Sequence, residues 1–291
     1  MLKSSITEDR KFDFILAPLV ATLLLASPVT VSAQTCTDDG SGPYGSLLDT
    51  EEFNQAVQAL PPAAFLTPRA QPPLSSHAYL SNLPAVSQQG TAAMPGSPGS
   101  CEAQSFGYGL GSYTAARRSD GLPKWIAALP ENSVSPAYLF AWGIANGYAQ
   151  CPKGEALPYL NHLVGFGAPT RARVPYEPDC SYFESTIPQQ RGFPDNYPDM
   201  KRFRIGSYAV FSISNDPQAA VQRIKEYIAN GQAVAFSGYV LCGYGLNLPM
   251  QDGVIYETSY VIGQNGQPAG HGQVVVGYDD DVGTPGNQGG C

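Results

Sequence analysis

Apolar side chains recur at helical spacing just after residue 100. Phe106, Leu110 and Tyr113 fall on one face of a helix, and Cys101 lies in its predicted first turn, directly after a Gly/Pro/Ser-rich loop. We expect this helix to end where arginines give way to Gly121, because cations and a glycine are typical of a helix C-terminus. The pattern therefore places one cysteine at the junction of a loop and a helix.

Two further helices are predicted in the same half of the chain. Ser135 is a typical N-cap and Pro136 a typical first helical residue, so a helix should run from there to Gly147. A third helix spans residues 154–165, where Pro158 either starts or kinks it.

The second half of the chain is richer in strands. We predict strands over residues 201–213, 233–240, 253–262 and 272–279, which are rich in β-branched and aromatic residues. A helix from Pro217 to Gly231 interrupts them, with Val221, Ile224 and Ile228 on one face. A helical first half and a strand-rich second half indicate an α+β fold with two lobes.

The N-terminal 80 residues differ from the rest. Residues 1–33 carry basic residues, then an apolar run at 14–26 and small residues, which is the pattern of an export signal. The apolar run is too short to span a bilayer. Residues 34–80 are rich in Pro, Ser and Ala and are expected to be an extension or short pro-segment that ends near His77. The main domain is then expected over residues 81–291, in a protein that is secreted or periplasmic.

The composition mainly serves to exclude some classes of binding partner. Hydrophobic residues make up 43% of 291 residues, which is enough for a core, and 31 Gly and 26 Pro indicate many loops. Sixteen basic residues against 24 acidic ones give a net charge of -8, which disfavours binding to nucleic acid or to an anionic membrane.

A thiol in the first turn of a helix has a chemical use. The N–H groups and the dipole of a helix N-terminus stabilise a thiolate, which is the nucleophilic form of cysteine. The alternative is that Cys101 is a structural cysteine, either buried or in a disulfide, and its position alone does not decide between the two.

Nucleophilic catalysis by cysteine also needs an imidazole, and the chain has three histidines. His77 lies in the Pro/Ser-rich segment and is expected to be solvated, whereas His162 is expected to be a packed or half-exposed helix residue. His271 stands at the start of a β-rich strand, where a rigid element can hold an imidazole in place. We therefore predict His271 as the partner of Cys101.

With these residues in place, the sequence resembles the papain-like cysteine peptidases over about residues 82–282. Six segments are similar to motifs of that family and follow the same order: "QQG…GSPGSCEAQSFGYGLGSY" (88–113), "SVSPAYLFAW" (133–142), "VPYEPDC" (174–180), "RIGSYAVF" (204–211), "IKEYIANGQAVAFSGYV" (224–240) and "AGHGQVVVGYDD" (269–280).

The resemblance implies a papain-like fold, in which a helical lobe and an antiparallel β-barrel-like lobe face each other across the active-site cleft. It implies Cys101 as nucleophile and His271 as ion-pair partner and general acid/base. The oxyanion would be held by the backbone N–H of Cys101 and by a glutamine side chain. Gln89 is the expected equivalent of that glutamine, across an insertion in the loop, and Gln88 is the alternative.

Two positions depart from the family pattern. Glu102 stands where the family usually has Trp, and because a negative charge beside the thiol opposes thiolate formation, we expect it to point away as an ordinary helix-start residue. The family also orients its histidine with an Asn on the strand after the histidine strand, and no such stretch is present. Asn287 lies in a turn-like sequence and is not expected to replace it. The peptidase domain is therefore expected to be incomplete at its C-terminal end.

The resemblance also implies a disulfide between Cys151 and Cys180. It would close a loop of about 30 residues and add roughly 3 kcal/mol in the chain-entropy model. Six cysteines in an exported chain are typical of disulfide formation, but the sequence does not decide how Cys36, Cys242 and Cys291 pair.

The expected function is a secreted cysteine endopeptidase that works through an acyl-enzyme. Two other functions stay open: a catalytically silent papain-fold binding protein or inactive fragment, and an amidase or transpeptidase on cell-wall peptides. No cofactor or metal is expected, because the acidic cluster at 278–281 lacks the spacing of a calcium loop and is expected to be a solvated strand end. The protein is expected to be a monomer whose partner is a peptide or protein substrate, with no nucleic acid and no membrane once the signal is removed.

Overall fold

The structure is a computed structural model that describes residues 36–37, 73–84, 98–118, 121–151, 153–188, 199–211, 217–239, 261–262 and 270–281. The predictions outside these residues concern the export signal, most of residues 34–80, and the positions Gln88, Gln89, Cys242, Asn287 and Cys291. The described part combines helices with small, mostly antiparallel sheets, as expected for an α+β fold.

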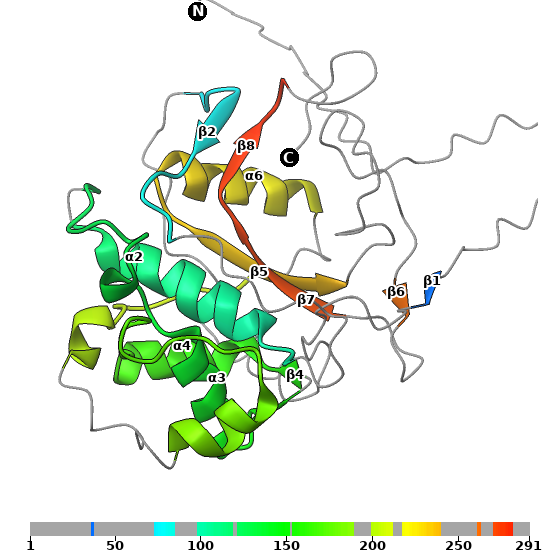
Figure 1. The fold of residues 1–291 in the computed structure, drawn as a ribbon. Helices are drawn as coiled ribbons and strands as arrows, with labels where there is room; N and C mark the ends of the chain where they lie inside the picture. The colour runs from blue at the N-terminus through cyan, green and yellow to red at the C-terminus, as the bar shows by residue number, and fades with distance from the viewer. Residues whose placement is uncertain are drawn as a thin grey trace, which may run out of the picture.

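Helices make up most of the described chain between residues 101 and 229 (Figure 1). They are η1 (Ala103–Gly111), α2 (Ser112–Ala116), η2 (Pro130–Asn132), α3 (Pro136–Ala145), α4 (Ala156–Gly165), η3 (Tyr182–Thr186), η4 (Met200–Phe203) and α6 (Pro217–Ala229). Cys101 and Glu102 form the first turn that leads into η1 and α2, and we call this continuous helix the Cys101 helix. Helices α3 and α4 pack beside it.

The predicted start of the Cys101 helix is confirmed, but its predicted end is wrong. The helix stops at Ala116, because Arg117 turns into an extended conformation with φ -85° and ψ 147° and forms a bridge to Pro123. The guanidinium of Arg117 donates a hydrogen bond to the carbonyl of Gly231, just beyond α6. Gly121, with φ +82°, belongs to the turn that follows. A contact with a distant element therefore ends the helix before the local signals would.

The other predicted helices are confirmed. Ser135 caps α3 by accepting a hydrogen bond from the backbone N–H of Tyr138 at 3.1 Å, and Gly147 after the helix has φ +80°. Pro158 is the third residue of α4. The backbone N–H groups of the first helical turn have no partner within the helix, so a proline there removes no helical hydrogen bond. Pro158 therefore belongs to the start of the helix and does not kink it.

Two of the predicted strands are confirmed. Strand β5 (Val234–Tyr239) pairs antiparallel with β7 (Gly270–Val275), and β8 (Gly277–Asp279) continues β7 after a break at Val276. Of residues 253–262, only β6 (Val261–Ile262) is described; it pairs in parallel with β1 (Cys36–Thr37). A short pair, β3 (Ala149–Gln150) and β4 (Lys153–Gly154), follows α3.

The strand predicted over residues 201–213 is wrong for its described part. Met200–Phe203 form a 3₁₀ turn, and residues 204–211 run without a strand partner. Phe203 and Ile205 lie instead in the helical core, and the backbone N–H of Ile205 donates to the carbonyl of Leu163 at 3.3 Å. Apolar burial against α4 therefore replaces sheet pairing.

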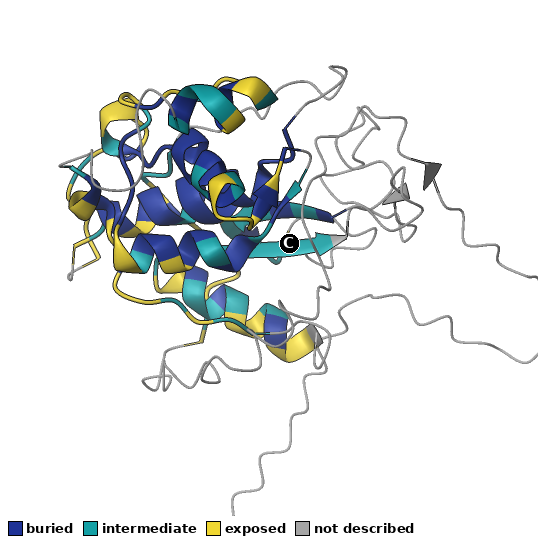
Figure 2. Cartoon of the chain, turned by 90° about the horizontal axis from the view of Figure 1, so that it is seen from below, coloured by how far each residue is buried: buried dark blue, intermediate teal, exposed yellow. Residues whose placement is uncertain are grey.

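Buried apolar side chains of the described residues gather in two clusters (Figure 2). The larger lies among η1, α3, α4 and η3, and its most buried members include Tyr138, Phe140, Tyr159 and Phe183. The smaller joins α6 to the strands and contains Leu80, Tyr113, Ile228 and Tyr278. The predicted division into two facing lobes stays a prediction.

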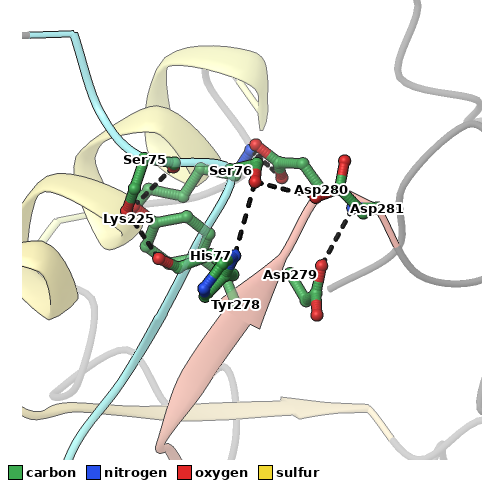
Figure 3. Close-up of polar contacts among 8 residues, drawn as sticks. All are labelled: Ser75, Ser76, His77, Lys225, Tyr278, Asp279, Asp280 and Asp281. Carbon is green, nitrogen blue, oxygen red and sulfur yellow. Dashed lines mark hydrogen bonds and ion pairs between the residues drawn. The ribbon is translucent and has the colours of Figure 1, made fainter.

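Residues 75–80, at the end of the predicted extension, pack against the strands. Strand β2 (His77–Tyr79) pairs antiparallel with β8, and the backbone N–H of Asp280 donates to the carbonyl of Ser76 at 2.7 Å (Figure 3). Side chains add to this, because Tyr278 donates to the carbonyl of Ser75 and Ser76 donates to Asp281. The side chain of His77 is exposed, as expected. No described helix has the length and apolar character that crossing a membrane requires.

The acidic cluster at 278–281 is more than a solvated strand end. Lys225 of α6 forms an ion pair with Asp280, and its ammonium lies 5.4 Å from the centre of the Tyr278 ring (Figure 3). The side chain of Lys225 is 8% exposed, whereas that of Asp280 is 37% exposed. The pair thus joins α6 to the strand that holds β2.

The unequal burial of this ion pair predicts unequal costs. Asp280→Asn leaves a buried ammonium without its counter-charge, and we expect it to lower the free energy of unfolding by about 2 kcal/mol. Lys225→Met leaves a carboxylate that water can reach, and should cost under about 1 kcal/mol. Urea unfolding at pH 7 measures both, and equal losses would contradict the assignment.

Candidate active site

Cys101 is the first residue of its helix and is 1% exposed. The helix begins with a hydrogen bond from the backbone N–H of Gln104 to the carbonyl of Ser100, at 2.9 Å. Cys101 is a thiol and not half of a disulfide. The predicted position, a thiol in the first turn of a long helix, is therefore present, and so is the burial that the structural alternative expected.

His271 is the second residue of β7 and lies opposite Gly238 of β5. Its side chain is partly buried, and this burial lowers its pKa from 6.5 to about 4. At neutral pH the imidazole is therefore uncharged, and this is the form that accepts a proton from a thiol.

The strand that carries His271 packs on the first turns of the Cys101 helix. A Cβ atom placed on Gly272 would lie 2.5 Å from Ser105 Oγ, and one on Gly109 would lie 2.7 Å from a methyl group of Val274. Glycine on each side of the interface thus lets helix and strand approach closely. Two segments 170 residues apart in the sequence, each with one candidate catalytic residue, meet at this interface.

Glu102 does not behave as expected. It is 1% exposed and its Oε1 accepts a hydrogen bond from Ser237 Oγ of β5, at 2.6 Å. The prediction of an ordinary helix-start residue is wrong, because the side chain enters the interface between the helix and the β5–β7 pair. Its partner lies 135 residues later, so no local pattern reveals the contact.

The predicted disulfide between Cys151 and Cys180 is confirmed, with 5.6 Å between the Cα atoms. It holds the loop before Cys101, because the backbone N–H of Gly99 donates to the carbonyl of Cys151 at 2.8 Å. On the same side, the hydroxyls of Ser100 and Tyr176 share a hydrogen bond of 2.6 Å. Burial raises the pKa of Tyr176 to about 12, so this hydroxyl stays neutral.

Removing the disulfide should therefore affect both stability and the site. We expect Cys151→Ser with Cys180→Ser to lower the free energy of unfolding by about 3 kcal/mol, as for a closed loop of this length. Because the backbone N–H of Gly99 is hydrogen-bonded to the carbonyl of Cys151, loss of the disulfide should also lower any peptide hydrolysis at temperatures where the variant is still folded. Denaturant unfolding and peptide hydrolysis of the same sample measure the two effects, and unchanged stability would contradict the structural role.

The other two histidines lie elsewhere. His162 lies in α4 and is 2% exposed. The centroids of the Tyr138, Trp142 and Phe166 rings lie between 4.2 and 5.7 Å from the centroid of its own ring. It is the packed helix residue that we expected. His77 lies on β2.

Sequence reasoning missed the polar residues that support this interface. Ser237, Ser105 and Tyr176 all lie in or beside segments that carry the family resemblance, but no motif gives them a role. The pairing register of β5 and β7 sets Ser237 opposite Gly272. This register is the signal that places Ser237 at the interface. Within the described ranges, no three His, Cys, Asp or Glu side chains gather as a metal site requires.

Comparisons with known proteins include a weak structural likeness. No family model matches the chain. No curated protein matches it either. Among solved structures, the chain is similar to xylellain, a cysteine protease from Xylella fastidiosa, with 18% identity, a TM-score of 0.48, and coverage of 85% of this chain and 84% of that one. A likeness at this identity and TM-score establishes neither fold nor function.

Proposed function

We propose that this chain is a papain-like cysteine endopeptidase with Cys101 as nucleophile and His271 as general acid/base. The observation that carries the proposal is the packing of the His271 strand on the first turns of the helix that begins at Cys101. A partly buried, neutral imidazole and a helix N-terminal thiol are the two groups that acyl transfer by cysteine needs.

In this mechanism the proton of the Cys101 thiol passes to His271, and the thiolate attacks the carbonyl carbon of a peptide bond. The C–N bond then breaks, His271 returns the proton to the leaving amine, and a thioester to Cys101 remains. Water, deprotonated by His271, hydrolyses the thioester and restores the thiol. The backbone N–H of Cys101 and the side chain of Gln89, or of Gln88, stabilise the oxyanion in both steps.

The disulfide supports a site of action outside the cytoplasm, because disulfides form and persist in oxidising compartments. The export signal over residues 1–33 and the role of residues 34–80 as a pro-segment are parts of the same proposal.

A second function is favoured by one observation. Cys101 is 1% exposed, which is the burial of a structural cysteine in a catalytically silent binding protein. Digestion of a mixed peptide library, followed by mass analysis of the products, separates these functions. Internal cleavage that is lost in His271→Ala supports the endopeptidase. Release of ammonia or exchange of acyl groups on cell-wall peptides alone supports an amidase or transpeptidase, and no reaction supports the binding protein.

A further inference from the structure

We propose that Glu102 is a positioning residue, whose carboxylate fastens the first turn of the Cys101 helix to the β5–β7 strand pair that carries His271. The inference rests on the proposed function, in which Cys101 and His271 act together. Glu102 directly follows Cys101 in the chain, so a contact that fixes its side chain also fixes the turn that presents the thiol.

The first support is a buried charge with a defined partner. Moving a carboxylate from water into a protein interior costs several kcal/mol of hydration free energy. Buried carboxylates are therefore rare unless they are hydrogen-bonded or ion-paired. Glu102 is 1% exposed, and its Oε1 accepts from Ser237 Oγ at 2.6 Å. Its place in the first turn also suits the positive end of the helix dipole.

The second support is the register of the strands. Ser237 of β5 lies opposite Gly272 of β7, and the next pair along the ladder is Gly238 with His271. The Glu102 hydrogen bond is therefore anchored one step from the pair that contains the imidazole. A shift of the Cys101 turn relative to His271 would have to break it.

The third support is the space left for the carboxylate. A Cβ atom on Gly272 would lie 2.8 Å from Glu102 Oε2, and real Cβ atoms essentially never approach a neighbouring atom within 3.0 Å. The absence of a side chain at position 272 thus makes room for the carboxylate between helix and strand.

Hydroxyl groups lie at the same interface as the carboxylate. Burial raises the pKa of Tyr159 of α4 well above 10, and the negative charge of Glu102 raises it further, so that Tyr159 stays neutral. Ser105 and Ser237 are the other hydroxyls at this interface. The hydrogen bond from Ser237 is the contact that ties the Glu102 carboxylate to β5.

The test measures how far the reactivity of Cys101 depends on His271, with iodoacetamide as the probe and the full chain as the sample. In the wild-type protein we expect His271→Ala to slow alkylation of Cys101 at pH 7 by about 100-fold, within the range of general-base effects. In a protein that already carries Ser237→Ala or Glu102→Ala, adding His271→Ala should slow the alkylation of Cys101 by less than about threefold. The reason is that Cys101 and His271 are no longer aligned in these variants.

Two variants separate positioning from general damage. Glu102→Gln keeps the shape and an acceptor for Ser237, and should retain most of the 100-fold dependence on His271. Ser112→Ala is the matched control: Ser112 is also a buried serine of the Cys101 helix, but its hydroxyl accepts a hydrogen bond at 2.8 Å from the backbone N–H of Val134. It should leave the dependence on His271 unchanged.

Full dependence on His271 in Ser237→Ala and in Glu102→Ala would overturn the inference. Peptide hydrolysis by the same samples keeps this outcome distinct from failure of the proposed function. If the wild-type chain cleaves peptides and these two variants match it in kcat and in alkylation, only the positioning role fails. If no peptide is cleaved but the dependence on His271 is present and vanishes in Ser237→Ala, only the proposed function fails. No dependence on His271 in the wild-type chain would overturn both.

Discussion

Replacing Cys101 by alanine is expected to lower peptide turnover by about 10⁴-fold or more, while thermal stability stays nearly unchanged. The loss follows because alanine provides no sulfur to form the acyl-enzyme. Stability should persist because the hydrogen bonds of the first turn involve backbone atoms of this residue. Ser105 donates to the carbonyl of Cys101, which alanine also has.

Hydrolysis of a peptide substrate and a thermal melt, both on the purified chain, measure these two effects. Cys101→Ser is the control variant, since it keeps the size of the side chain and should lose turnover to a similar degree. A fall of many degrees in melting temperature with turnover retained would instead support a structural cysteine, as its 1% exposure alone suggests.

The second large effect is a loss of stability in acid that arises from His162. Burial among aromatic rings lowers its pKa from 6.5 to about 4. The unfolded chain therefore binds a proton at this residue at a higher pH than the folded protein does. Its contribution to stability is fully present above pH 6.5 and is lost as the pH falls to 4. A shift of this size corresponds to about 3 kcal/mol.

Urea unfolding at pH 7 and at pH 4 tests this effect. His162→Phe keeps an aromatic ring and cannot titrate, so between these two pH values it should lose about 3 kcal/mol less stability than the wild-type protein. His77→Gln, which replaces the exposed histidine of β2, is the matched control and should follow the wild-type protein. An equal loss in His162→Phe and the wild-type protein would contradict the buried, neutral state of His162.

The sequence predicts those parts of the fold that depend on local chemistry. Ser135 and Pro136 mark the start of α3, and Pro217 marks that of α6, because caps and proline act within one turn. Strands β5 and β7 follow from their β-branched composition. The cysteine pair comes instead from the family resemblance, since spacing alone does not fix which cysteines meet.

The errors all involve contacts between distant segments. The Cys101 helix ends at Ala116 because Arg117 bonds to Gly231, and residues 204–211 have no strand partner because their apolar side chains pack on helices. The burial of Glu102 escapes prediction for the same reason, since its partner Ser237 lies on β5. Local patterns cannot give such contacts, and this is why the candidate catalytic residues could be predicted while the residue proposed to position them could not.

The measurement that tests the central claim most directly is labelling of the purified chain with an epoxide-type cysteine peptidase inhibitor, followed by mass mapping of the modified residue. We predict that the label appears on Cys101 and is lost in His271→Ala, because the thiolate needs the imidazole as its partner. A folded sample with no label on Cys101, or with the same label in His271→Ala, would contradict a Cys101–His271 catalytic pair.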